Sequence, residues 1–293
     1  MKSGYVAVIG RANAGKSTLV NVLVGEKVAI VSPKPQTTRD RITGVLTTDD
    51  YQIAFVDTPG LYKADNLLNS VMQKTVQDSV EDVDLVLFVL DAHAGISDKD
   101  KSILKKFTNL QVPTVLALTK TDIMPESLLI SELGELSSEN IEVVPVSARK
   151  NRNVKELIKV IVDKLPEGEK LFDFEIVSDR SEKFMIGEIV REKILLKCDK
   201  EIPHGVAVIV NKFENLANSK VCEVSVDIIC ERPNHKAIII GKGGSKIKEI
   251  STFAREEMEK FLGKKVFLTT YVKVKEDWRN SAFLLKEHGY GEQ

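Results

Sequence analysis

The feature that most constrains this chain is a glycine-rich segment directly after its first apolar run. Residues 10–17 read GRANAGKS, which fits the pattern G-x-x-x-x-G-K-[ST] and lies between a predicted strand and a predicted helix. Glycine lets the backbone curl so that successive N–H groups point inward, and the helix that follows adds the positive end of its dipole. The segment therefore predicts a phosphate-binding loop at the carboxyl end of a strand.

The rest of the first 168 residues fits an α/β domain built around that loop. Strand-like apolar runs alternate with helical patterns, which predicts a mostly parallel sheet with helices on both faces. The six expected strands are 5–9, 41–47, 52–56, 85–90, 114–118 and 142–145. The expected helices are 16–24, 67–82, 98–110, 125–138 and 152–165. Only Asp49 and Asp50 join the second and third strands, so we expect a hairpin there and one antiparallel edge strand.

The pattern changes after a polar stretch, LPEGE, at residues 165–169. Beyond it we expect an α+β module of order α-β-β-α-α-β. Its elements are a helix at 181–197, strands at 206–213 and 221–230, a short helical turn, a helix at 245–261 and a strand at 266–275. We therefore expect a first domain over 1–168, a linker over 169–180 and a second domain over 181–293 that ends in a C-terminal helix.

Composition excludes several classes of protein. Hydrophobic residues make up 43% of the 293 and charged residues 29%, which is typical of a soluble globular protein and excludes a disordered chain. The net charge of −1 excludes a globally basic nucleic-acid binder, so any basic surface must be local. Cys198, Cys222 and Cys230 show no CxxC spacing, as expected of reduced thiols in the cytoplasm. No run approaches the roughly 20 apolar residues of a membrane span.

Two residues of the loop are predicted to carry most of its chemistry. Lys16 is expected to reach the β- and γ-phosphates, and Ser17 to give an oxygen to Mg²⁺. The other loop residues and the residue that follows are expected to line the nucleotide: Gly10, Arg11, Ala12, Asn13, Ala14, Gly15 and Thr18.

A second motif, Asp57-Thr58-Pro59-Gly60, ends the third strand. Asp57 can hold Mg²⁺ through water, and the N–H of Gly60 can bond to the γ-phosphate. Alone, the tetrapeptide is equally compatible with a simple turn. Following a phosphate-binding loop, it indicates a nucleotide site, to which we also assign Leu61.

The third motif lies after the fifth strand and predicts the base. The carboxylate of Asp122 can accept the N1–H and the exocyclic amine of guanine, which adenine cannot offer, so the site would reject ATP. The stem of Lys120 can pack on the ring. After the last strand, backbone N–H groups can meet the guanine carbonyl. The residues assigned to this part of the site are Thr119, Lys120, Thr121, Asp122, Ser147, Ala148 and Arg149.

In their order and positions these motifs resemble those of the translation-factor class of GTPases, which implies GTP and GDP as ligands. One residue departs from the class, because Thr119 stands where the N-K-x-D motif usually has Asn. Another is Leu61, which stands where many GTPases place a water-orienting Gln, so we expect slow intrinsic hydrolysis. Residues 32–41, SPKPQTTRDR, form a predicted switch loop. By its place, Thr38 resembles the switch threonine that binds Mg²⁺, with Thr37 as the alternative.

The predicted catalytic residues are Lys16, Asn13, Thr38 and Gly60, and the predicted metal ligands are Ser17, Thr38 and Asp57. In related GTPases an Asn at the position of Asn13 helps to bind K⁺, so we hypothesise weak stimulation by K⁺. The alternative is that Asn13 is only a loop residue that tolerates a left-handed backbone.

The second module contains IIIGKGGSKIK at 238–248, whose G-x-x-G loop and element order resemble a type II KH domain. Such a loop lies against a single-stranded nucleic-acid backbone. Residues 232–275 include eleven basic residues and only four acidic ones, and this local excess of positive charge indicates a nucleic-acid-binding surface. Ile239 and Ile240 suit the core better than base contact. The residues assigned to RNA are Ile240, Gly241, Lys242, Gly243, Gly244, Ser245, Lys246 and Lys248.

Nearly the whole chain resembles the Era-type family of bacterial ribosome-assembly GTPases. The matching segments are GRANAGKSTLVN, PQTTRDRITG, DTPG, EIVREKILL, IIIGKGGSKIKEI and YVKVKEDW with LKEHGY. The resemblance implies a Ras-like G domain followed by a type II KH domain that binds small-subunit (16S) rRNA near its 3′ end, and a role in 30S assembly. It also implies peripheral association with the inner membrane, and we expect a monomer. The alternatives are a tRNA-modifying or metabolic GTPase that uses the KH module for another RNA, and an RNA-binding protein with a vestigial nucleotide site.

Overall fold

The computed structural model describes residues 1–60, 65–108, 112–125, 128, 130, 141–215 and 220–290. Contacts within the chain divide it into two compact units. The first unit consists of Met1–Ala29, Thr38–Lys63 and Met72–Asp179. The second consists of Ile30–Thr37, Ala64–Val71 and Arg180–Gln293. A short segment of the predicted switch loop therefore belongs, by its contacts, with the C-terminal part of the chain.

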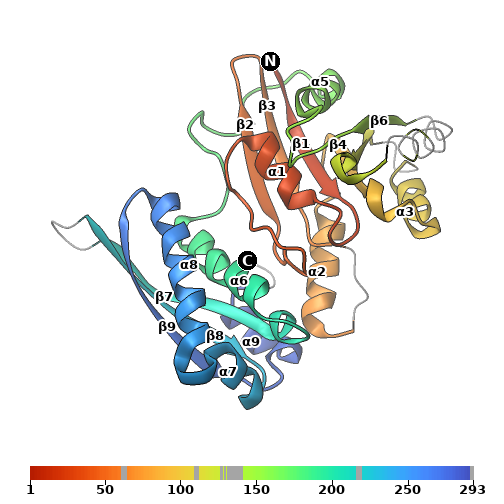
Figure 1. Ribbon diagram of the computed structural model, residues 1–293. Helices are drawn as coiled ribbons and strands as arrows, with labels where there is room; N and C mark the ends of the chain where they lie inside the picture. Colours follow the sequence, from red (N-terminus) through yellow and green to blue (C-terminus); the bar gives the residue numbers. More distant parts are fainter. Residues whose placement is uncertain are drawn as a thin grey trace. The chain divides into compact units, whose positions relative to one another are not determined.

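The first unit is built on a six-stranded sheet of order β2-β3-β1-β4-β5-β6 (Figure 1). The strands are β1 (Lys2–Ile9), β2 (Ile42–Thr47), β3 (Tyr51–Asp57), β4 (Leu85–Asp91), β5 (Thr114–Thr119) and β6 (Glu142–Pro145). β2 runs antiparallel to β3, and all the remaining pairs of neighbouring strands are parallel. The predicted sheet, its hairpin and its antiparallel edge are therefore confirmed.

Side chains that alternate along β1 enter two separate cores, because neighbouring residues of a strand point to opposite faces. Val6 and Val8 pack in one core with Leu19, and Ala7 and Ile9 lie in the other. The helices of this part of the chain are α1 (Lys16–Val24), α2 (Leu67–Asp78), α3 (Asp98–Thr108) and α5 (Val154–Lys164). Covering helices on both faces leave the strand ends as the open edge, which is where the predicted motifs lie.

Two helices differ from the expectation. α2 ends at Asp78 rather than at residue 82, since residues 79–82 form turns in which Asp82 has a left-handed φ of 60°. The helix expected at 125–138 falls largely outside the described residues. Within the described ranges, no helix is both long and apolar enough to cross a membrane.

The segment predicted as a linker, 169–180, is fixed along the β2–β3 hairpin. Gln52 accepts hydrogen bonds from the backbone N–H groups of Leu171 and Phe172, at 2.6 and 2.9 Å. Farther along, the N–H of Val45 donates to the carbonyl of Val177 at 2.9 Å. By contacts, the first unit therefore extends to Asp179.

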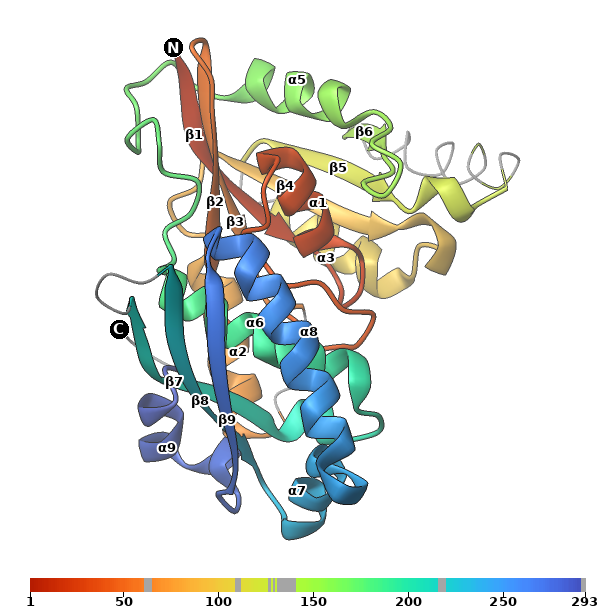
Figure 2. The same ribbon diagram turned by 60° about the vertical axis from the view of Figure 1, so that its left-hand side comes forward.

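The second unit has a three-stranded sheet of order β7-β8-β9, with β7 and β8 antiparallel and β8 and β9 parallel. Its regular elements are α6 (Glu182–Lys197), β7 (Val206–Asn215), β8 (Val221–Cys230), α7 (Pro233–Ile240), α8 (Ser245–Leu262), β9 (Lys265–Val274) and α9 (Ala282–Glu287). α6 and α8 lie side by side against the sheet (Figure 2). The predicted order α-β-β-α-α-β is confirmed, and the expected short helical turn is the complete helix α7.

Candidate functional site

The phosphate-binding loop connects the end of β1 to the start of α1. A Cβ at Gly10 would lie 2.2 Å from the carbonyl oxygen of Val89, so the strand can end there only in glycine. Asn13 and Gly15 have left-handed backbones, with φ of 62° and 93°. Gly15 has no side chain to cap α1, so the first N–H groups of the helix remain available to an anion.

The DTPG motif is packed directly on this loop. A Cβ at Gly60 would lie 2.8 Å from the Cα of Ala12, so the two backbones approach as closely as glycine allows. Thr58 is buried, and its hydroxyl donates to the carbonyl of Val8 at 2.8 Å. This contact holds the turn against β1 and places the Gly60 peptide beside the loop. Leu61 lies outside the described residues.

Lys16 is buried, and its side chain folds back onto the loop. Its Nζ donates to the carbonyls of Gly10 and Arg11, at 3.0 and 3.1 Å. Burial lowers the pKa of Lys16 to about 8, although the carboxylate of Asp57 partly opposes the shift. A buried ammonium with so low a pKa is stabilised by an incoming phosphate, because the phosphate restores the negative charge that burial withholds.

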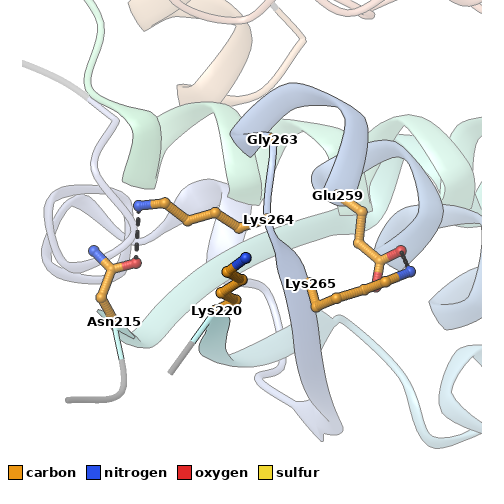
Figure 3. Close-up of a pocket in the computed structure, with 6 residues that line it drawn as sticks. All are labelled: Asn215, Lys220, Glu259, Gly263, Lys264 and Lys265. Atoms are coloured by element: carbon orange, nitrogen blue, oxygen red, sulfur yellow. Dashed lines mark hydrogen bonds and ion pairs between the residues drawn. The ribbon is translucent and has the colours of Figure 1, made fainter. Parts of the chain in front are cut away.

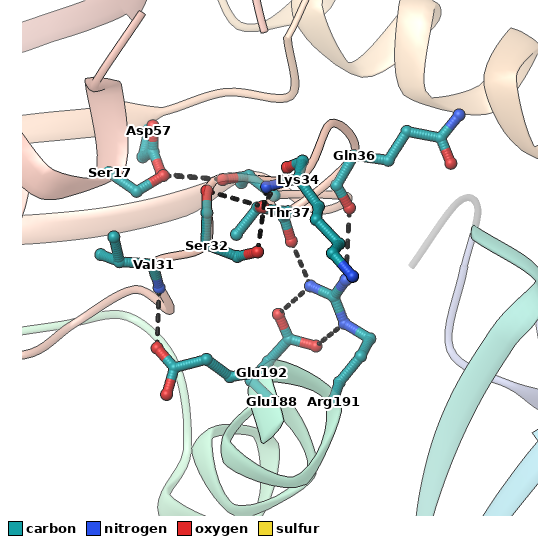
Figure 4. Close-up of polar contacts among 11 residues, drawn as sticks. Ser17, Val31, Ser32, Lys34, Gln36, Thr37, Asp57, Glu188, Arg191 and Glu192 are labelled. Carbon is teal, nitrogen blue, oxygen red and sulfur yellow. Dashed lines mark hydrogen bonds and ion pairs between the residues drawn. The ribbon is translucent and has the colours of Figure 1, made fainter. Parts of the chain in front are cut away.

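Three oxygen-bearing side chains from three segments meet at the head of α1. Figure 4 shows two of them, Ser17 and Asp57. Ser17 donates to Asp57 Oδ2 at 2.6 Å, and the hydroxyl of Thr38 lies 2.8 Å from that of Ser17 and 3.3 Å from Asp57 Oδ2. Thr37, the alternative to Thr38, instead donates to the carbonyl of Lys34 at 2.7 Å. The structure therefore brings Thr38, and not Thr37, to the other two predicted ligands.

The same cluster has the chemistry of a Mg²⁺ site. Asp57 is fully buried, and within the described part of the chain its Oδ1 has no hydrogen-bond partner. Burial raises the pKa of Asp57, while Lys16 and the hydroxyls of Ser17 and Thr38 act in the opposite direction. A hard divalent cation would pair with that unsatisfied oxygen and make the ionised carboxylate stable at neutral pH.

At the end of β5, Thr119 braces the loop in place of the usual Asn. Its hydroxyl is 2.6 Å from the carbonyl oxygen of Ala14 and 2.8 Å from that of Leu90. Asp122 accepts a hydrogen bond from Ser147 Oγ at 2.6 Å, and this bond lowers the pKa of Asp122. Asp122 is therefore ionised at neutral pH, as the predicted acceptor of the guanine donors must be.

The remaining predicted contacts lie on the same loops at the strand ends: Thr18 in α1, Pro59 after β3, Thr121 in the 3-10 turn Thr121–Ile123, and Ala148 and Arg149 in the turn after β6.

Two ion pairs at this edge were not expected from the sequence. Nζ of Lys120 pairs with Asp91, the last residue of β4, at 2.6 Å. Arg11 forms an ion pair with the buried carboxylate of Asp100 at 2.8 Å and donates to the carbonyl of Gly95 at 3.1 Å. For Asp91 a signal existed, since it is a polar residue that ends an apolar strand at the same edge as the loop. Nothing local in the sequence pairs Arg11 with Asp100.

The glycine loop of the second unit joins α7 to α8 through a 3-10 turn, Lys242–Gly244. A Cβ at Gly241 would lie 2.9 Å from the backbone nitrogen of Lys246, so that glycine is required by the fold. Gly243 and Gly244 are left-handed, and a Cβ on either would meet nothing within 4 Å.

These two glycines therefore present an open backbone surface, whereas Ile239 is fully buried in the core. Ile240 and Lys246 are partly buried, and Lys242, Ser245 and Lys248 are exposed.

A separate pocket lies at the far end of α8 from this loop (Figure 3). It is lined by Asn215, Lys220, Glu259, Gly263, Lys264 and Lys265. Two of its three lysines are already engaged, because Lys264 donates to Asn215 at 3.3 Å and Lys265 pairs with Glu259 at 3.2 Å. Because the pocket lies at the other end of α8 from Gly243, it is not part of the glycine loop.

A phosphate-binding loop, an oxygen cluster beside it and an ionised carboxylate after β5 are the parts of a guanine-nucleotide-binding protein, and the second unit has the element order of a KH domain. Family comparisons agree, since residues 5–120 match the family "50S ribosome-binding GTPase" and residues 201–279 match the family "KH domain". GTPase Era of Clostridium kluyveri is 45% identical over 293 residues, which cover 99% of each chain. The chain belongs to the Era family of GTPases.

Two solved structures share the whole fold. A variant of Era from Aquifex aeolicus bound to GDP and AlF₄⁻ is 39% identical, with a TM-score of 0.95 and full coverage of both chains. Era in complex with MgGDPNP and nucleotides 1506–1542 of 16S ribosomal RNA is 40% identical, with the same TM-score and coverage.

Proposed function

We propose that this protein is a GTP-hydrolysing switch that binds 16S rRNA near its 3′ end and acts in assembly of the 30S subunit. The observation that carries the proposal is a single chain that combines the Ser17–Thr38–Asp57 oxygen cluster with an open glycine loop at 241–244. The relative solved with both MgGDPNP and 16S nucleotides supports the pairing of these two sites. We assign the G domain to residues 1–168, the linker to 169–180 and the KH domain to 181–293.

The chain's own residues divide the work at the nucleotide. The loop amides and Lys16 would bind the β- and γ-phosphates, and Asp122 would select guanine. Ser17, Thr38 and Asp57 would hold Mg²⁺, which supplies positive charge to the phosphate oxygens when bound. The N–H of Gly60 would donate to the γ-phosphate, so loss of that phosphate would release both Gly60 and Thr38.

Hydrolysis is expected to be slow without a partner, because the hydrocarbon side chain of Leu61 cannot orient water. We further propose that Asn13 helps to bind K⁺ beside the phosphates and that K⁺ stimulates hydrolysis weakly. The left-handed backbone of Asn13, with φ of 62°, is also what the alternative predicts, so the salt comparison decides between the two. Phosphate release would be measured in matched KCl and NaCl buffers for the wild type and for Asn13→Ala. Equal wild-type rates in both salts would contradict the proposal.

At the RNA, the open backbone of Gly243 and Gly244 would approach phosphates, and the surrounding lysines would supply positive charge. The test is crosslinking to RNA in cells, followed by sequencing of the attached fragments. We expect the 3′ end of 16S rRNA and 30S precursors. Recovery of tRNA instead would favour the alternative, a tRNA-modifying GTPase. Lys16→Ala should abolish nucleotide binding in vitro while it spares RNA affinity in the absence of nucleotide.

We place the protein in the cytoplasm, where its proposed RNA is, and expect a monomer with a peripheral contact to the inner membrane. Sedimentation equilibrium would test the monomer. Flotation with vesicles of anionic phospholipid would test the membrane contact, and failure to float at low salt would contradict it.

A further inference from the structure

Among the described residues of the second unit, the most deeply buried charged side chain contacts the predicted switch loop. Arg191 on α6 is 1% exposed, and its guanidinium forms two bonds with Glu188, at 2.7 and 2.6 Å. Nη1 of Arg191 donates to the carbonyl of Gln36 at 3.3 Å, and Nη2, which also bonds to Glu188, donates to the carbonyl of Thr37 (Figure 4). One planar group is thus shared between a carboxylate of its own helix and two consecutive carbonyls of another segment.

Further contacts fix the same segment, residues 30–37, to α6 and its surroundings. Glu192 accepts a hydrogen bond from the backbone N–H of Val31 at 2.8 Å. Lys34 pairs with Asp199 at 2.9 Å, just beyond the end of α6. These contacts hold the segment at its start and in its middle, and Arg191 holds it at its end.

The end that Arg191 holds is directly joined to the metal cluster. The boundary between the two units falls between Thr37 and Thr38. The carbonyl of Thr37 and the N–H of Thr38 belong to one planar peptide, so fixing that carbonyl limits where the Cα of Thr38 can lie. The hydroxyl of Thr38 is the one that meets Ser17 and Asp57.

The opposite face of α6 belongs to the core of the KH-containing unit. Ile186, Ile189, Val190 and Ile194 are buried there against residues of the sheet and of α8. A shift of α6 that accompanied RNA binding would therefore move the guanidinium of Arg191, because a close-packed helix moves as a body.

We propose that Arg191, oriented by Glu188, is a positioning residue for Thr38 and couples the KH domain to the γ-phosphate. The inference rests on the proposed function and deepens it by naming the contact through which the nucleotide state is communicated. Arg191 touches neither nucleotide nor metal; it selects the backbone conformation in which Thr38 reaches the metal cluster. By linkage, RNA affinity and preference for GTP over GDP depend on the same contact.

The test compares affinities for a non-hydrolysable GTP analogue and for GDP, both with Mg²⁺, in the full-length protein. Thr38 acts only when the γ-phosphate is present, so Arg191→Met should weaken analogue binding by about five- to tenfold and change GDP binding little. The ratio of RNA affinities in the two nucleotide states should move toward one. A merely structural role would change neither ratio.

The matched control is Arg279→Met. Arg279 makes the same two-bond contact with Glu231, at 2.9 and 2.6 Å, in the same unit. Its loss should leave both ratios unchanged. If Arg191→Met does not fold, Glu188→Gln with Arg191→Met removes the buried pair without leaving a lone charge, and Arg191→Lys keeps the charge without the planar fork.

A double-mutant cycle with Thr38→Ala makes the assignment specific. Once the Thr38 hydroxyl is absent, Arg191→Met should cause no further loss of preference for the GTP analogue. The proposal is overturned if folded Arg191→Met keeps the wild-type ratio, or if it lowers that ratio equally in the Thr38→Ala background. A wild type whose RNA affinity is the same with the GTP analogue and with GDP would instead refute the proposed switch function.

Discussion

Replacing Thr119 with valine tests whether this residue braces the phosphate-binding loop. The side chain is 3% exposed, and its hydroxyl lies within hydrogen-bond distance of the carbonyls of Ala14 and Leu90. A hydroxyl carries one proton and donates to one acceptor at a time, and the 2.6 Å contact favours Ala14, inside the loop. Valine has nearly the same shape but no donor, so the substitution removes the bond without opening a cavity.

The expected magnitude follows from the buried acceptors that are left behind. An unsatisfied buried carbonyl costs about 1–3 kcal/mol, so the free energy of unfolding should fall by an amount in that range. If the bond also holds the loop amides in their binding orientation, the same loss appears in nucleotide affinity. GDP binding should then weaken by about fivefold to about a hundredfold.

Fluorescent GDP titrations with Mg²⁺ and urea unfolding of the empty protein measure the two quantities. The control is Thr114→Val, at the other end of β5, where the hydroxyl donates to the carbonyl of Val112 at 3.1 Å and is remote from the loop. The reasoning is refuted if Thr119→Val unfolds more easily than the wild type and still binds GDP with wild-type affinity.

Three further predictions concern other parts of the protein. Asp122→Asn replaces an acceptor of two guanine donors with an amide, so GDP affinity should fall by about a hundredfold or more. The affinity for xanthosine diphosphate, which has a carbonyl in place of the amine, should rise. A competition assay that showed no such exchange of preference would contradict the base assignment. Gly243→Asp should weaken binding of a 16S 3′-end RNA by about tenfold. The melting temperature and the GTP turnover should not change, since the φ of 58° at Gly243 suits Asp and a Cβ there meets nothing within 4 Å. An RNA affinity equal to that of the wild type would exclude the loop from the RNA surface. The pKa of Lys16 is about 8 in the empty folded protein and near 10.5 in the unfolded chain, so between these pH values the unfolded chain binds more protons. The free energy of unfolding should therefore rise with pH over that window, and Lys16→Met should lose this rise. GDP binding at pH 8.5 should take up protons, and equal binding heats in buffers of different ionisation enthalpy would contradict the low pKa of Lys16.

Much of the nucleotide site could be predicted from the sequence because its parts are contiguous. The loop from Gly10 to Ser17 needs only its own glycines, the preceding strand and the following helix to form an anion site. Asp57 and Asp122 follow strands β3 and β5, and neighbouring parallel strands present their carboxyl ends at one edge of the sheet. Alternating apolar residues likewise predicted the strands, since that period reflects local geometry.

Other features needed the tertiary structure, because they depend on which distant surfaces meet. Thr119 and Ala14 are 105 residues apart, and Arg191 and Thr37 are 154 apart. A threonine hydroxyl or a guanidinium has many possible partners along a chain this long, and no local period selects one. The resemblance favoured Thr38 over Thr37, but only the fold shows their contacts, which join Thr38 to Ser17 and Asp57 and Thr37 to the carbonyl of Lys34.

From the sequence we predicted the chemistry of both sites: a loop that would bind phosphate, a carboxylate that would select guanine and a glycine turn suited to a nucleic-acid backbone. The fold was needed to show that residues 30–37 belong with the KH-containing unit while Thr38 belongs with the other. Motif chemistry resides in neighbouring residues, whereas the unit to which a loop belongs depends on the buried partners, here Arg191 and Glu192, that folding brings to it.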